Sequence, residues 1–136
     1  MTDSTAVREA EGILLDATRR IAMPKAGECL CCFVIRMIDQ HGCDTTLRWS
    51  QRFRDLRAPR ATALESRLSR MGGFCDCEIF MNGVSVARHL QVVERDEYDE
   101  IVDVRWPAPL PECAAVRRGS TRWCSNWERQ TRRLMW

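Results

Sequence analysis

The chain has 136 residues, the size of a single domain, and its apolar content of 45% is sufficient for a hydrophobic core. Its first 25 residues have no basic start and no long apolar run, and no segment reaches the ~18 apolar residues of a membrane span, so we expect neither an export signal nor a membrane helix. The expected location is the reducing cytoplasm, which argues against a disulfide framework for the eight cysteines.

The formal net charge of +2 hides a strong segregation of charge. Residues 48–70 carry seven arginines against two acids, and residues 116–136 carry six arginines against one acid. Between them, residues 94–103 carry six acids and one arginine. Either the basic segments meet RNA or the ribosome, or the acidic segment neutralises them within the chain and the partner is a protein.

Two helices are predicted in the first third of the chain. Apolar residues spaced by three or four positions predict a helix over residues 4–21, which Pro24 and Gly27 end. The same spacing predicts a second helix that begins near Leu30 and is stopped by His41-Gly42. Cys29 and Cys32 then lie at the start of this second helix.

A third helix is predicted after Asp44, whose carboxylate is placed to accept the free amide hydrogens of a first turn. This helix should turn Leu47, Phe53 and Leu56 inward before Ala58-Pro59 breaks it.

A fourth helix is predicted from the capping-box spacing of Thr62 and Glu65. It should bury Leu64 and Leu68, and Gly72-Gly73 should close it.

The pattern then changes to that of strands. Residues 74–81 alternate, and Asn82-Gly83 followed by Val84–Val86 indicates a hairpin. Further strands are predicted at residues 90–93 and 101–106. Helices followed by a small antiparallel sheet make an α+β fold, stabilised by a thiolate-rich metal site.

A Pro-rich connector starts near Trp106 and contains three prolines within residues 107–111. It divides the predicted zinc-stabilised domain, residues 1–106, from a basic, Trp-bearing tail, residues 107–136. A short helix is predicted in the tail at residues 125–135.

Five cysteines have the pattern of metal ligands. Cys29 and Cys32 form a C-x2-C pair, Cys75 and Cys77 form a C-x-C pair, and Cys43 lies between the pairs. Two thiolate pairs from separate segments can converge on one tetrahedral zinc ion, and zinc is favoured over Cu(I) or an iron–sulfur cluster. The alternative is that these thiols are metal-free and pack as small apolar groups.

The sequence around these cysteines also resembles a small bacterial domain family of unknown function. The resemblance rests on Gly42-Cys43-Asp44-Thr45-Thr46-Leu47-Arg48 and on Gly72-Gly73-Phe74-Cys75-Asp76-Cys77-Glu78, which are similar to the family motifs GCD-H-TLR and GG-[FY]-CDCE. It covers about residues 29–83 and implies a shared trio of Cys43, Cys75 and Cys77.

The chain departs from the short members of that family at Thr45, where they have His. That departure removes a fourth ligand, which Cys29 or Cys32 would replace, as in a longer branch of the family with a preceding C-x2-C pair. Cys31 is expected to face the core, while Cys113 and Cys124 have no matching pair and are interpreted as incidental thiols. His41 is expected to be solvent-exposed.

No catalytic motif accompanies the predicted zinc site: we find no HExxH, no deaminase signature and no phosphate loop. We therefore expect a non-enzymatic binding or regulatory module without a small-molecule substrate or a membrane partner. One alternative is an RNA- or ribosome-associated factor, and another is a thiol-based redox or zinc sensor. The residues expected to contact RNA are Arg48, Arg52, Arg54, Arg129, Arg132, Arg133, Trp123 and Trp127.

Overall fold

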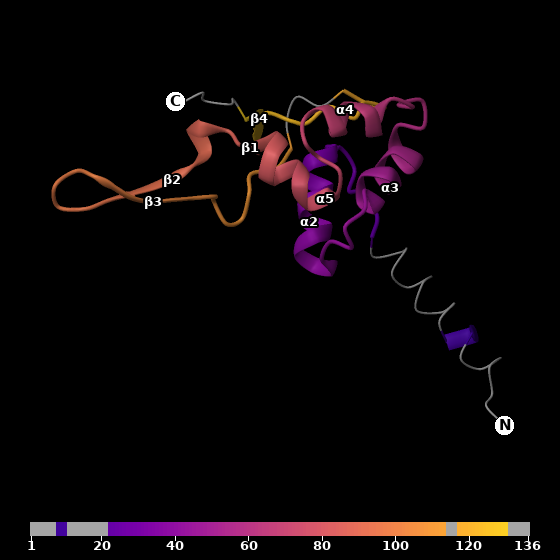
Figure 1. Cartoon of the computed structure of the whole chain (residues 1–136), viewed down its shortest axis with the longest axis horizontal. Helices are drawn as coiled ribbons and strands as arrows, with labels where there is room; N and C mark the ends of the chain where they lie inside the picture. Colours follow the sequence, from indigo (N-terminus) through magenta and orange to yellow (C-terminus); the bar gives the residue numbers. More distant parts are fainter. Residues whose placement is uncertain (1–7, 11–21, 114–116, 131–136) are drawn as a thin grey trace.

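The computed structural model of the chain describes residues 8–10, 22–113 and 117–130. Of the predicted N-terminal helix over residues 4–21, only residues 8–10 lie within these ranges, and they are helical. The described helices and strands confirm an α+β fold (Figure 1). Its elements are α2 (Leu30–His41), α3 (Arg48–Arg57), α4 (Leu64–Arg70), α5 (Asp76–Glu78), a π-helical turn (Ile79–Gly83), β1 (Val84–Val86), a 3-10 turn (Arg88–Leu90), β2 (Val92–Arg95), β3 (Ile101–Arg105) and β4 (Trp127–Arg129).

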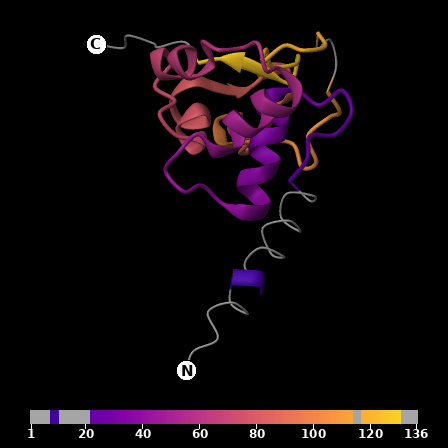
Figure 2. The same ribbon diagram turned by 90° about the vertical axis from the view of Figure 1, so that its right-hand side faces the viewer.

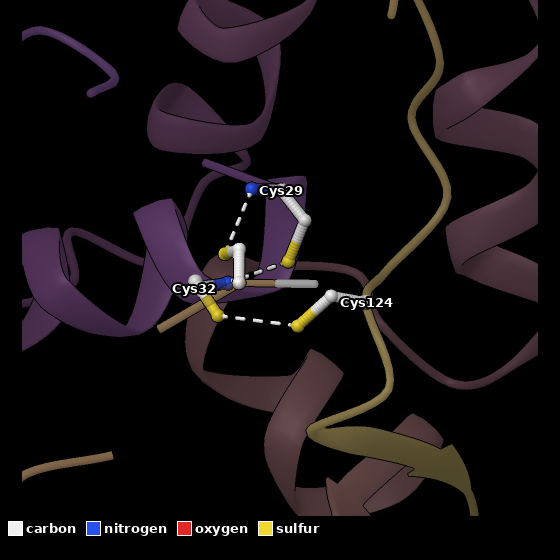
Figure 3. Close-up of side chains that lie close together, drawn as sticks. Cys29, Cys32 and Cys124 are labelled. Atoms are coloured by element: carbon white, nitrogen blue, oxygen red, sulfur yellow. Dashed lines mark hydrogen bonds between the residues drawn. The ribbon is translucent and has the colours of Figure 1, made fainter. Parts of the chain in front are cut away.

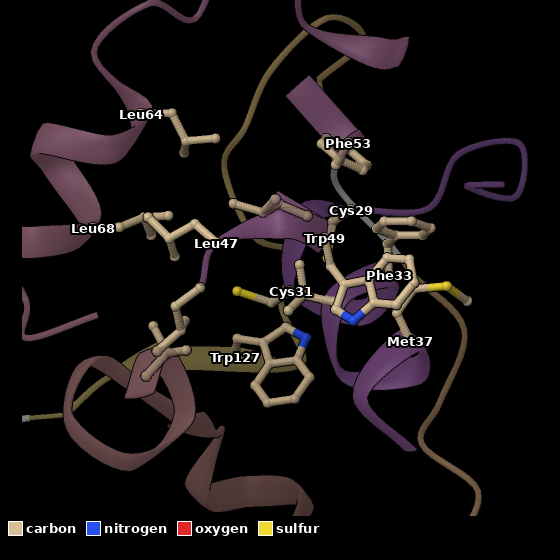
Figure 4. Close-up of a cluster of buried hydrophobic side chains, with 14 of the residues drawn as sticks. Cys29, Cys31, Phe33, Met37, Leu47, Trp49, Phe53, Leu64, Leu68 and Trp127 are labelled. Atoms are coloured by element: carbon tan, nitrogen blue, oxygen red, sulfur yellow. The ribbon is translucent and has the colours of Figure 1, made fainter. Parts of the chain in front are cut away.

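Helix α2 lies at the centre of the core and ends where the sequence predicts. Its Phe33 is fully buried and packs on Phe53 of α3, with ring centroids 5.9 Å apart. Gly42 ends the helix with a positive φ of 79°, and its N–H donates to the Ile38 carbonyl. Figure 4 shows apolar side chains of α3, α4 and β4 gathered around this helix.

The predicted cap of α3 is wrong. The Asp44 carboxylate accepts hydrogen bonds from the amide and the hydroxyl of Thr46, so it closes a turn before the helix. The first-turn amides of Trp49 and Ser50 instead donate to Asp76, at 2.9 and 3.1 Å. A residue 26 positions further along the chain therefore supplies the cap. Leu56, predicted to face inward, is 38% exposed.

The predicted capping box of α4 does not form either. The helix begins at Leu64 and has no side-chain cap. The Glu65 carboxylate accepts from Arg54 of α3 at 3.1 Å, which leaves it unavailable for the start of its own helix. Leu64 and Leu68 are buried, as predicted.

The strand and hairpin predicted over residues 74–86 are largely replaced by helical turns. Residues 76–83 form α5 and the π-helical turn, and only β1 remains as a strand. The amide of Asp76 donates to the Thr46 carbonyl at 3.0 Å, while the Asp76 carboxylate binds α3. These long-range contacts fix the segment in a conformation that its local alternation does not favour.

The tail after the Pro-rich connector packs into the body. Strand β4 pairs antiparallel with β1, in a register that places Val86 opposite Trp127. The predicted tail helix is therefore wrong over residues 127–129, and residues 131–136 lie outside the described ranges. Trp127 is 3% exposed and belongs to the core, so residues on both sides of the connector share one core.

Strands β2 and β3 form a hairpin that projects from the helical body (Figure 1). The two predicted strands are confirmed, although β2 starts only at Val92, because Arg88–Leu90 forms a 3-10 turn. Figure 2 views the body from the side opposite this hairpin. No helix among the described residues is long and apolar enough to cross a membrane.

Candidate metal centre

Four cysteine side chains from distant parts of the chain converge at the start of α2. Their sulfur atoms all lie within 4.8 Å of one another. Figure 3 shows three of them, Cys29, Cys32 and Cys124, with their sulfurs turned toward one another. The complete group, called here the thiol cluster, consists of Cys29, Cys32, Cys113 and Cys124.

The first turn of α2 positions two of the four thiols. Cys29 is the N-cap residue, and its sulfur accepts the amide hydrogen of Cys32 at 3.4 Å. Because residues three apart lie on one face of a helix, the C-x2-C spacing presents both sulfurs to the same side.

The other two thiols, Cys113 and Cys124, come from two later segments of the chain. The Cys113 sulfur accepts the Cys29 amide at 3.2 Å, and the Cys124 sulfur lies 3.7 Å from that of Cys32. Asn126 connects the two segments, since its side-chain amide donates to the Pro111 carbonyl at 2.6 Å. The pairing of β1 with β4 holds this part of the chain beside α2.

The sulfurs of the thiol cluster are close enough together to hold one metal ion. Zn–S bonds of about 2.3 Å require sulfurs about 3.8 Å apart, close to the 3.7 Å between Cys32 and Cys124. The indole N–H of Trp127 donates to the Cys32 sulfur at 3.2 Å, a contact that favours a thiolate. Cys29 and Cys124 are 0% and 3% exposed. A site in which four thiols fill all the coordination positions is typical of a structural metal ion.

Two members of the thiol cluster, Cys32 and Cys113, have a pKa raised above the ordinary value of a thiol. Burial raises the pKa of Cys113 to about 12. A hydrogen bond with Cys29, together with burial, raises the pKa of Cys32 well above its usual range. A metal ion must therefore displace protons when it binds, because thiolates are the ligands.

The thiol cluster differs from the set of ligands that the sequence predicts. Cys29 and Cys32 come together, but with Cys113 and Cys124 rather than with Cys43, Cys75 and Cys77. Cys113 and Cys124 lie in different segments, so they do not form a C-x2-C pair that can be recognised in the sequence. The sequence signal for this grouping is a count alone. The C-x2-C pair of Cys29 and Cys32 and the two single cysteines, Cys113 and Cys124, together supply four thiols.

Cys31 lies in the core, as predicted. It is 1% exposed, and burial raises the pKa of its thiol well above the ordinary value. It is not part of the thiol cluster, although it is next to Cys32 in the chain.

The remaining predicted ligands form a separate trio around Cys43. Burial favours the neutral thiol of Cys43, but hydrogen bonds from the backbone of Cys77 and Thr45, and from the side chains of Cys77 and Cys75, lower its pKa overall. Cys75 is 7% exposed, and Cys43 and Cys77 are partly exposed.

A groove of about 820 Å³ borders the thiol cluster between α2 and the Pro-rich connector. Cys32 and Cys113 line it, together with Arg36 and Trp106. The two partly exposed members of the thiol cluster are thus the ones that a chelator or oxidant would reach first.

The residues predicted to contact RNA are placed in several ways. Trp127 lies inside the core, and Trp123 is packed against it, so the ring of Trp127 has no face free for a base. Arg48 binds the Gly42 carbonyl, Arg52 binds the Ala22 carbonyl, and Arg54 binds Glu65. Arg129 is exposed, while Arg132 and Arg133 lie outside the described residues.

Part of the chain matches a known family model. The model of a family described as "Protein of unknown function (DUF2695)" matches residues 30–82. This supports the resemblance to a domain family of unknown function. The matched segment includes Cys43, Cys75 and Cys77, but only Cys32 of the thiol cluster. No curated protein and no solved structure matches the chain.

Proposed function

We propose that this protein is a cytoplasmic, non-enzymatic binding module whose fold is stabilised by a structural zinc ion held by Cys29, Cys32, Cys113 and Cys124. The observation that carries the proposal is the convergence of four thiols, with all sulfurs within 4.8 Å, from distant segments of the chain, Cys29 and Cys113 being 84 residues apart. An ion held there joins the start of α2 to the last part of the core. All four coordination positions are filled by the chain, which leaves none for a substrate.

Zinc is the ion that this site suits best. It accepts four thiolates in a tetrahedron, and it has no redox chemistry that the site would need to control. We expect protein purified from its own host without added metal to contain zinc by native mass spectrometry. Removal of the ion by a strong chelator should abolish the far-ultraviolet helical signal, and added zinc should restore it. A fully folded, metal-free protein or iron–sulfur absorption would contradict the proposal.

The β2–β3 hairpin is the element best suited to bind a partner. Its apolar residues Val92, Val93, Ile101, Val102 and Val104 are 40–57% exposed. A two-stranded hairpin alone is only marginally stable in water. Its turn is nevertheless held by Asp96, whose carboxylate accepts the amides of Tyr98 and Glu100 at 2.9 Å each. The hairpin is therefore an ordered element that exposes apolar side chains.

The charge of the hairpin supports the proposal of a basic protein as its partner. Residues 92–105 carry six acids and two arginines, a net charge of −4. Among the described residues, the ion pairs of this segment are internal, from Arg95 to Asp99 and from Arg105 to Glu94 and Asp103. The acids thus do not neutralise the arginines of α3 and α4. Glu97 and Glu100, which are outside these ion pairs, can meet a partner with a basic surface, and apolar contacts would add to the binding.

Charge reversal at the hairpin should remove that partner. We expect Glu97→Lys/Glu100→Lys to lose at least tenfold in the capture of a basic protein from the host, because both carboxylates are exposed and outside the internal ion pairs. The matched control is Asp39→Lys/Asp55→Lys, which makes the same change in net charge on α2 and α3. Cross-linking followed by mass spectrometry of each variant measures the loss.

Equal capture by both variants would contradict this assignment. The RNA alternative is tested with the same proteins and a mixed-sequence single-stranded RNA at low and high salt. Micromolar binding that weakens steeply with salt and is unaffected by the hairpin variant would replace the protein partner with RNA.

A further inference from the structure

A polar hollow is formed by residues outside both the thiol cluster and the β2–β3 hairpin. It has a volume of about 400 Å³, and its walls come from the end of α4, the π-helical turn and the end of β4. The residues that line it are Arg70, Met71, Asn82, Arg129 and Gln130. The pairing of β1 with β4 brings Arg129 to this place, since Arg129 lies opposite Val84, the residue directly after the π-helical turn.

The polar hollow carries positive charge that the chain does not neutralise. Arg70 and Arg129 are both exposed, and neither side chain forms an ion pair or a hydrogen bond with the described residues. No acidic residue lines the hollow. Glu128, the acid next to Arg129 in the chain, pairs with Arg88 at 3.2 Å. Two unpaired guanidinium groups at one hollow repel each other, and an anion bound between them would be attracted to both.

Hydrogen bonds hold the uncharged wall of the polar hollow in place. The Nδ2 of Asn82 donates to the Gly72 carbonyl at 3.0 Å, and the Nε2 of Gln130 donates to the carbonyls of Phe80 and Val84 at 3.0 and 3.1 Å. Both amide nitrogens are thus engaged, whereas the side-chain oxygens of Asn82 and Gln130 have no donor among the described residues. These oxygens are therefore acceptors for the hydroxyl groups of a ligand.

We propose that the polar hollow binds the phosphate group of a small phosphate ester, such as a nucleotide or a sugar phosphate. Arg70 and Arg129 hold the phosphate, because a guanidinium group donates two parallel hydrogen bonds to phosphate oxygens. The side-chain oxygens of Asn82 and Gln130 accept from hydroxyl groups of the molecule that carries the phosphate. The volume of about 400 Å³ lies within the range of small-molecule sites.

The test is isothermal titration calorimetry of the full chain with inorganic phosphate, adenosine 5′-monophosphate and adenosine. We expect both phosphate-containing probes to bind, and the monophosphate to bind more tightly than inorganic phosphate because its ribose adds hydroxyl groups. Adenosine, which lacks the phosphate, should not bind. Absence of binding by both phosphate-containing probes at millimolar concentration, or equal binding by adenosine and its monophosphate, would overturn the proposal.

Two matched variants locate the phosphate. Arg70→Gln/Arg129→Gln removes both charges from the polar hollow and should weaken binding of the monophosphate at least about tenfold, since it removes charge-assisted hydrogen bonds. Arg60→Gln/Arg118→Gln removes the same charge from two exposed arginines that do not line the hollow, so it should leave the affinity nearly unchanged. Equal weakening by both pairs would show that phosphate is attracted only by the net charge, and the site would be refuted.

A strand of RNA offers the same phosphate chemistry, so a 5′-phosphorylated single-stranded oligoribonucleotide is titrated in parallel. We expect it to bind no more tightly than the monophosphate. Much tighter binding of the strand that is lost in Arg70→Gln/Arg129→Gln would assign the hollow to RNA and overturn the small ester as its ligand.

The fold of the variants is checked separately from phosphate binding. The polar hollow shares no residue with the thiol cluster, so Arg70→Gln/Arg129→Gln should keep the zinc content and the far-ultraviolet signal of the wild type. Loss of zinc or of helical signal in this variant would show that the two arginines support the fold rather than a ligand.

Discussion

Replacement of Cys29 and Cys124 together by Ser is expected to leave the chain unfolded at 25 °C. The two sulfurs come from the start of α2 and from the segment that leads into β4. Their replacement therefore removes one ligand from each of these segments and leaves only two thiols in the cluster. Structural zinc contributes an apparent binding free energy of about 10–16 kcal/mol. A domain of this size has a total stability of about 5–15 kcal/mol, so it cannot absorb such a loss.

Circular dichroism and zinc content of the purified variant measure this result. The matched control is Cys31→Ala, which changes an equally buried cysteine in the same turn of α2 whose sulfur is outside the thiol cluster. The control should keep its zinc at the thiol cluster and lose only about 1–2 kcal/mol from the smaller side chain. A folded Cys29→Ser/Cys124→Ser protein with undiminished zinc would show that the thiol cluster holds no metal.

Replacement of Asp76 by Ala should destabilise the protein by about 3–5 kcal/mol. The carboxylate is fully buried and accepts three hydrogen bonds, from the amide of Trp49, the amide of Ser50 and the hydroxyl of Ser50. Without it, α3 loses its cap and two amides lose their acceptor inside the core, where water does not replace it.

Urea unfolding of the zinc-loaded protein measures this cost. Ser50→Ala is the control, because it removes only the hydroxyl contact of 2.7 Å and leaves both amide contacts, at an expected cost of about 1 kcal/mol. Asp76→Asn keeps one acceptor oxygen and should fall between the two. Equal destabilisation by Ser50→Ala and Asp76→Ala would show that the amide contacts contribute little.

The sequence predicts those elements whose signals are local. Helix α2 follows its apolar spacing and stops at Gly42, and the buried Leu64 and Leu68 follow the same spacing in α4. The hairpin strands β2 and β3 were also predicted near their observed positions, because alternation and the acidic turn between them are properties of one short segment.

The errors arise where a distant residue overrides the local pattern. Residues 76–83 are helical because Asp76 caps α3, a contact that the alternation of this segment does not reveal. Asp44 and Glu65 have the spacing of caps, but their carboxylates bind Thr46 and Arg54 instead. Spacing shows that a cap is possible, and the tertiary structure decides which carboxylate provides it.

The candidate site was predictable in part for the same reason. Cys29 and Cys32 are predicted as ligands because their C-x2-C spacing is visible in the sequence itself. Cys113 and Cys124 lie beside them because β1 pairs with β4 and Asn126 contacts Pro111. Neither of these contacts has a short motif in the sequence.

The distance along the chain between the halves of the thiol cluster has a consequence for biosynthesis. Cys29 leaves the ribosome 84 residues before Cys113 and still earlier than Cys124. Until β4 has emerged from the ribosome, the nascent chain therefore exposes the thiols of Cys29 and Cys32 and the apolar face of α2. During that interval the core is incomplete, so zinc capture becomes the last step of its maturation. A ribosome that stalls before residue 124 would release a product with an unfinished metal site, which is a natural substrate for proteolysis.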